Sequence, residues 1–123
     1  SVTDNMFEEY NYNKLFYEFI GIYYLHTFDT YLLILKENNL NFKIHLYNKL
    51  VLNVPIFIFD LEILKSISKV KISFDNQLMI LEENKKCSSM YYFYKISKSE
   101  IFKLNTLEIE ESIIELELIY GIN

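Results

Sequence analysis

The chain has 123 residues, of which 51% are hydrophobic and 17% aromatic, and its formal net charge is −5. This composition excludes an intrinsically disordered chain, which has few apolar and aromatic residues, and the length predicts a single domain over residues 1–123. All 12 basic residues are lysines, and there is no arginine to read bases or pair with phosphates. We therefore expect no nucleic-acid partner.

The residue types also bear on the source and the compartment. Alanine, arginine and tryptophan are absent while isoleucine, asparagine and lysine abound, which is typical of an AT-rich genome. Cys87 is the only cysteine, so no internal disulfide forms, as suits a reducing compartment. The polar, acidic start does not resemble a signal peptide, and no apolar run reaches the ~20 residues of a membrane helix. We expect a cytoplasmic protein without a membrane partner.

The first segment has the pattern of a helix. Asp4 or Asn5 is a candidate N-cap, and Glu8 follows Asn5 at the spacing of a capping box. Apolar residues then recur at intervals of three and four as far as Tyr24, as on one face of a helix. The range 16–25 is also rich in aromatic and β-branched residues, so its second half is open to a strand interpretation, with Gly21 at the point of doubt.

From residue 30 onwards the pattern is that of strands joined by short turns. Asparagine, aspartate and lysine clusters separate apolar or alternating runs, as in β-hairpins. Pro55 interrupts one run, which must therefore lie at a sheet edge, contain a bulge or end there. The sequence predicts an α+β fold with an N-terminal helix packed on a curved, mainly antiparallel β-sheet of about six to eight strands. The expected strands are 31–35, 40–47, 50–59, 70–74, 77–82, 90–96 and part of 101–120.

The last segment carries the whole net charge of the chain. Residues 100–123 contain six glutamates and one lysine, whereas residues 1–99 contain 11 acids and 11 lysines. Within 107–120, glutamates alternate with leucine and isoleucine, which in a strand places carboxylates on one face. The alternation changes phase across 111–113, so a bulge, turn or break is expected there. A helix is the competing interpretation, with Gly121 as its C-cap.

Catalytic and metal-binding patterns are weak. Cys87 with His26 or His45 has the residue types of a nucleophile–base pair, but Cys87 lies in an expected turn beside two lysines. The two histidines have no metal-ligand spacing, and the alternation at 40–47 places His45 on the exposed face. With two glycines the chain has no phosphate-binding loop. We expect no enzyme activity, no metal and no cofactor.

The acidic strand region is the candidate partner-binding site. One interpretation is a solubilising outer face, and the other is a docking surface for a basic protein. The leading hypothesis is a non-enzymatic inhibitor or immunity-type protein that neutralises a basic toxin such as a nuclease. The alternatives are a viral or phage accessory protein that self-associates, for example as a homodimer, and a small ligand-binding or enzymatic domain. The predicted partner-binding residues are Glu108, Glu110, Glu111, Glu115, Glu117, Tyr92 and Tyr94.

Overall fold

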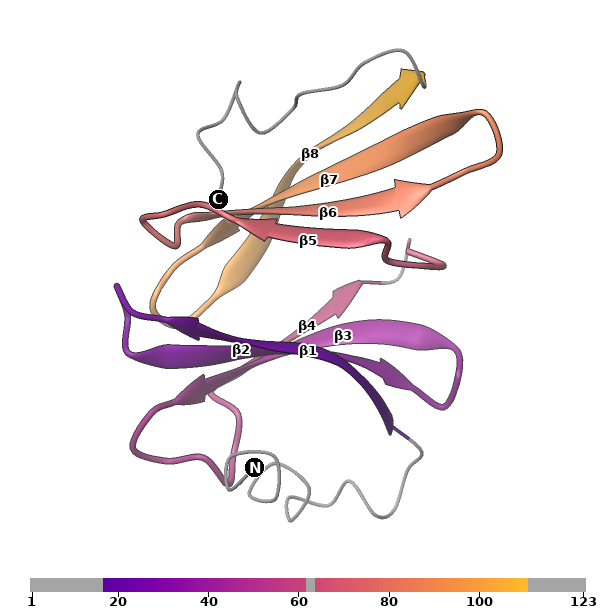
Figure 1. Ribbon diagram of the computed structural model, residues 1–123. Coiled ribbons are helices and arrows are strands. Elements are labelled where there is room, and N and C mark those ends of the chain that lie inside the picture. Colours follow the sequence, from indigo (N-terminus) through magenta and orange to yellow (C-terminus); the bar gives the residue numbers. More distant parts are fainter. Residues whose placement is uncertain (1–16, 62–63, 111–123) are drawn as a thin grey trace. The chain divides into compact units, whose positions relative to one another are not determined.

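The computed structural model describes residues 17–61 and 64–110, which form eight strands in two four-stranded antiparallel sheets (Figure 1). Strand order follows chain order in both sheets, β1-β2-β3-β4 and β5-β6-β7-β8. The first sheet and Lys98–Glu100 belong to one compact unit, and the second sheet belongs to another. The strands are β1 (Tyr17–Leu25), β2 (Thr30–Glu37), β3 (Asn41–Asn48), β4 (Phe57–Leu61), β5 (Lys69–Ile72), β6 (Leu78–Asn84), β7 (Ser88–Ile96) and β8 (Ile101–Glu110).

The predicted α+β class is wrong, because the described part of the chain contains β-strands and no helix. The second half of the expected helix is strand β1, whereas its first half lies outside the described residues. A register shift between Phe19 and Gly21 adds one residue to β1. Phe19 then pairs with Leu35 and Ile22 with Leu33, so two residues three apart share one face. This three-residue step, made by a bulge, imitates the spacing of a helix.

The predicted antiparallel pairing is confirmed, although the strands form two sheets rather than one, and the hairpins depend on turn residues that tolerate positive φ. Asn38 and Asn39, between β2 and β3, have φ of 53° and 58°. Leu40 N donates to Glu37 O at 3.0 Å and closes this turn. Asn76 has φ of 64° in the turn between β5 and β6. Asparagine adopts this left-handed region more readily than other non-glycine residues, so these positions end the strands locally.

The central strands of the first sheet are buried on both faces. Leu33 and Leu35 cluster with Tyr47 on one face, and Leu32 and Ile34 on the opposite face have no exposed surface. Strands covered on both sides have apolar residues at consecutive positions, which explains the run Leu32–Leu35. β3 is likewise buried at consecutive positions from Ile44 to Tyr47, so a polar side chain in this range is buried as well.

His45 on β3 is one such position, and the expectation that it is exposed is wrong. Its side chain is 3% exposed, and its Nδ1 lies 3.3 Å from the Tyr47 hydroxyl. Burial, followed by the positive charge of Lys43, lowers the pKa of His45 to about 4. The alternation of Leu, Phe and Ile with polar residues in β3 indicated one solvent-exposed face, but both faces of the strand are buried around His45.

The second sheet contains a smaller cluster on one face. Ile80, Phe93 and Ile109, from β6, β7 and β8, are buried together, and the partly buried Leu78 and Tyr91 pack against them. Each side chain comes from a strand hydrogen-bonded to the next, so the cluster crosses three neighbouring strands. It anchors the last residues of β8 to the sheet, because Ile109 lies directly before the strand's final residue.

Candidate partner-binding site

Strand β8 holds the described part of the acidic segment and lies at an edge of the second sheet. It pairs with β7 and with no other described strand (Figure 1). Seven of its ten side chains are exposed, among them Phe102, Leu104 and Leu107 at 45%, 52% and 39%. An edge strand presents unpaired backbone N–H and C=O groups, to which an extended segment of another chain can add.

Glu108 and Glu110 leave the same face of β8 at its carboxyl end. Glu108 pairs with Met90, and Glu110 pairs with Ser88. The Ser88 hydroxyl donates to Glu108 Oε2 at 2.8 Å, which orients this carboxylate along the sheet. Residues two apart on a strand share a face, so the two exposed carboxylates form one small acidic patch, named here the β8 acidic patch.

The β8 acidic patch has basic neighbours as well. Lys85 and Lys86, both exposed, lie in the turn between β6 and β7, at the same end of the sheet. Lys103, the basic residue of β8, lies with its ammonium 5.6 Å from the centre of the Tyr92 ring. The two turn lysines offset the two patch carboxylates, but Glu83 pairs with Met90 as Glu108 does and adds a third carboxylate, so this end of the sheet is of mixed charge.

The two tyrosines predicted for the site are inside the protein. Tyr92 is 2% exposed and Tyr94 is 3% exposed. Burial and the hydrogen bond to Glu83 raise the pKa of Tyr92 to about 12, and burial raises that of Tyr94 further above its ordinary value. The structure therefore places Glu108 and Glu110 at the surface and these phenols beneath it. Both hydroxyls stay protonated at neutral pH.

Glu83 on β6 is a buried carboxylate that the sequence did not predict. It is 5% exposed, and its Oε2 accepts hydrogen bonds from the backbone N–H groups of Lys65 and Ser66 at 3.0 and 3.2 Å. Its Oε1 accepts from the Tyr92 hydroxyl at 3.0 Å. The carboxylate thus ties the segment before β5 to β6 and β7. Its sequence neighbour Glu82 faces the other side of the sheet. Two adjacent glutamates on a strand imply that one of them points to each face, and this was the one signal in the sequence for a buried carboxylate.

The remaining predicted residues are distributed as follows. Glu111, Glu115, Glu117 and the phase change at 111–113 lie outside the described residues. Cys87 is exposed in the β6–β7 turn of the second unit, whereas His26 and His45 belong to the first unit. Among the described residues, no group of three or more histidine, cysteine, aspartate or glutamate side chains is arranged to hold a metal ion.

Within residues 17–61 and 64–110, no helix is long and apolar enough to span a membrane. Comparison with protein-family models, with curated proteins and with solved structures finds no match to this chain.

Proposed function

We propose that the protein is a non-enzymatic binding module that takes a protein partner at the edge of β8. The observation that carries the proposal is the combination of a strand edge that no other described strand pairs with and seven exposed side chains on that strand. Addition of a partner strand would supply main-chain hydrogen bonds, and the exposed apolar side chains would supply contact area. The single-domain organisation over residues 1–123 is part of the same proposal.

The β8 acidic patch supports a partner with basic residues. A lysine or arginine on the added strand would meet Glu108 or Glu110, and such charge pairs would fix the register of the strand and contribute to its affinity. A cationic toxin such as a nuclease is a partner class that fits, and the protein would then act as its cytoplasmic inhibitor. Beneath the patch, the buried Tyr92 hydroxyl donates to Glu83 Oε1 at 3.0 Å and links β7 to β6.

A charge-matched pair of variants tests this site. Glu108→Gln/Glu110→Gln removes two negative charges from the patch, and the control Glu18→Gln/Asp60→Asn removes two from exposed positions on β1 and β4. We expect catalytically inactive, basic nuclease domains to bind the wild type and the control equally and the patch variant at least tenfold more weakly, because two charge pairs are lost. Equal weakening in both variants would reduce the effect to net charge, and unchanged binding would reject the site.

Self-association is the second candidate, and the edge strand β4 favours it. Val54, Ile56 and Ile58, on β4 and the segment before it, are 47%, 44% and 51% exposed. β4 pairs with β3 alone among the described strands, and Asp60 is its one charged residue. Natural edge strands usually carry lysine, proline or a bulge that prevents such pairing, and Pro55 precedes β4 without interrupting it.

Light scattering at micromolar concentration tests the second candidate. We expect a dimer for the wild type and a monomer for Ile58→Lys, because a charge at the centre of the edge opposes a second copy. Leu40→Lys is the control, since Leu40 is 72% exposed in the turn between β2 and β3. A wild-type monomer over the whole concentration range would contradict self-association and leave the β8 site unaffected.

A further inference from the structure

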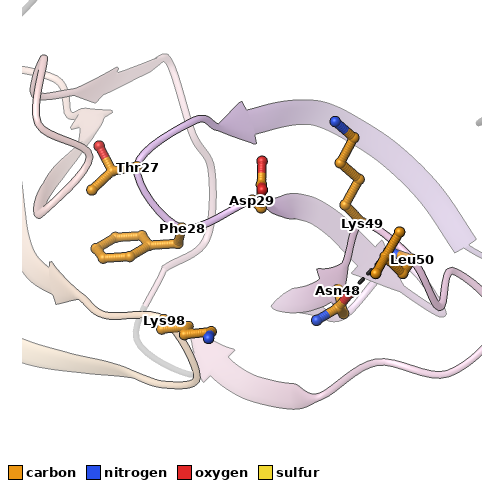
Figure 2. A pocket seen from close by; sticks show the side chains of 7 residues that line it. All are labelled: Thr27, Phe28, Asp29, Asn48, Lys49, Leu50 and Lys98. Carbon is orange, nitrogen blue, oxygen red and sulfur yellow. Dashed lines mark hydrogen bonds between the residues drawn. The ribbon is translucent and has the colours of Figure 1, made fainter.

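A pocket of about 500 Å³ opens beside the β1–β2 turn in the first unit. Its walls come from three separate pieces of chain: the β1–β2 turn, the end of β3 with the residues after it, and the segment that begins at residue 98 (Figure 2). This volume is in the range of small-molecule sites. The lining residues are Thr27, Phe28, Asp29, Asn48, Lys49, Leu50 and Lys98.

The pocket's one carboxylate is already engaged. Asp29 Oδ1 accepts a hydrogen bond from the Tyr24 hydroxyl, and the Asp29 backbone oxygen accepts one from Lys49 N at 3.1 Å. Asp29 has φ of 52°, so the turn holds it in the left-handed conformation in which both contacts form. The Lys49 side chain extends away from the other lining side chains in Figure 2, and its ammonium lies 5.5 Å from the centre of the Tyr24 ring. Asp29 and Lys49 therefore both contact Tyr24, and their opposite charges offset each other in the wall.

The charge that is not offset within the wall is the ammonium of Lys98, and Asn48 and Phe28 add an amide and an apolar ring. Lys98 is exposed and has no ion-pair or hydrogen-bond partner among the described residues. Asn48 Oδ1 accepts a hydrogen bond from Leu50 N at 2.8 Å. This bond orients the amide so that its NH2 group points away from Leu50 (Figure 2). An ammonium and an amide NH2 are donors that suit an oxyanion. The Phe28 ring, half-buried, supplies a flat apolar surface beside Lys98.

We propose that this pocket binds a small organic anion, namely a carboxylate or phosphate carried on an aromatic ring. Lys98 and the Asn48 amide bind the oxyanion, and Phe28 contacts the ring. The site is independent of the β8 edge, because none of the residues that carry the β8 proposal lines the pocket. It gives the binding module a small-molecule ligand in addition to a protein partner.

Titration of the ¹⁵N-labelled protein with phenyl phosphate, benzoate, inorganic phosphate and benzyl alcohol tests the proposal. We expect saturable shifts of the Phe28, Lys49 and Leu50 amide signals with the two aromatic anions, and at least tenfold weaker binding of inorganic phosphate and benzyl alcohol. The comparison of phenyl phosphate with benzoate identifies the preferred oxyanion. Equal binding of benzyl alcohol, or no saturable shift with either aromatic anion, would overturn the proposal.

Two variants and a control locate the binding groups. Lys98→Gln should weaken anion binding about tenfold, the loss that one charge-assisted hydrogen bond accounts for. Asn48→Asp keeps the oxygen that accepts from Leu50 N but replaces the amide donor by a negative charge, so binding should be abolished. Lys86→Gln, an equal charge change in the β6–β7 turn, should bind as the wild type does. Wild-type affinity in Lys98→Gln, or equal losses in Lys98→Gln and Lys86→Gln, would overturn the assignment.

Discussion

Removal of the Glu83 carboxylate should be among the most damaging single changes in the second sheet. The carboxylate accepts three hydrogen bonds, two from the backbone N–H groups of Lys65 and Ser66 and one from the Tyr92 hydroxyl. A hydrogen bond to a charged group contributes about 1.5–3 kcal/mol, and a buried donor left without an acceptor costs about 1–3 kcal/mol. Lys65 and Ser66 are exposed, so water can replace part of what they lose. Glu83→Ala should therefore lower the free energy of unfolding by about 4 kcal/mol.

Conservative substitutions at Glu83 and Tyr92 should lower the free energy of unfolding in an order that a cavity alone would not produce. Glu83→Gln keeps an oxygen for the two backbone donors and should cost about 1–2 kcal/mol. Tyr92→Phe removes one bond and leaves the carboxylate two donors, so it should cost about 2 kcal/mol. The double variant Glu83→Gln/Tyr92→Phe should cost about 1 kcal/mol less than the sum, since both changes remove the same contact.

Urea unfolding followed by far-ultraviolet circular dichroism measures these differences, because the chain has no tryptophan. Glu82→Ala is the matched control, because the residue is adjacent on β6 but faces the other side, and its carboxylate makes no hydrogen bond or ion pair with the described residues. The control should change the free energy of unfolding by less than about 0.5 kcal/mol. A Glu83→Ala protein as stable as Glu82→Ala would refute the role assigned to the carboxylate.

Three further outcomes follow from buried polar groups. Because the folded protein raises the pKa of Tyr92 from 10.0 to about 12, Tyr92 should contribute a fall in stability of up to about 3 kcal/mol as the pH rises from 10 to 12, and Tyr92→Phe should remove this part of the fall in alkaline unfolding curves. His45 has the opposite sign: its pKa is lowered from 6.5 to about 4, so the stability it contributes above pH 6.5 should be lost as the pH falls to 4. This loss is about 3 kcal/mol, and unfolding curves of His45→Gln should lack it. Thr30 is fully buried and its hydroxyl has no partner among the described residues, so Thr30→Val should raise the free energy of unfolding by about 1 kcal/mol, and a loss of stability would contradict this.

The hairpins were predictable from the sequence because their causes are local. Asn38, Asn39 and Asn76 adopt positive φ within the turns where they were expected, and alternating or apolar runs flank them. The start of the sheet was not predictable in the same way. The bulge between Phe19 and Gly21 breaks the two-residue alternation, and single-sequence periodicity does not distinguish such a break from a helical face.

The polar groups of the interior were missed for a different reason. Whether His45 is buried depends on what covers both faces of β3. Alternation along one strand shows that one face is more polar than the other, but it does not show whether the more polar face is exposed to solvent. Glu83 is satisfied by donors at Lys65 and Ser66, and the pocket joins Lys98 to the β1–β2 turn. These contacts connect positions that are distant in the sequence, so no local sequence pattern predicts them.

The proposed binding function depends more on the main-chain groups at the edge of β8 than on the charge of the acidic segment. Within the described residues, the two turn lysines balance the β8 acidic patch, so electrostatic steering by the patch alone is weak. The edge of β8 is independent of this balance, because its hydrogen-bonding groups are those of the main chain. A docked strand would therefore remain bound in moderate salt, and neutralising Glu108 and Glu110 would weaken its binding without abolishing it. Binding that disappears entirely in about 0.3 M salt would instead favour charge as its main source.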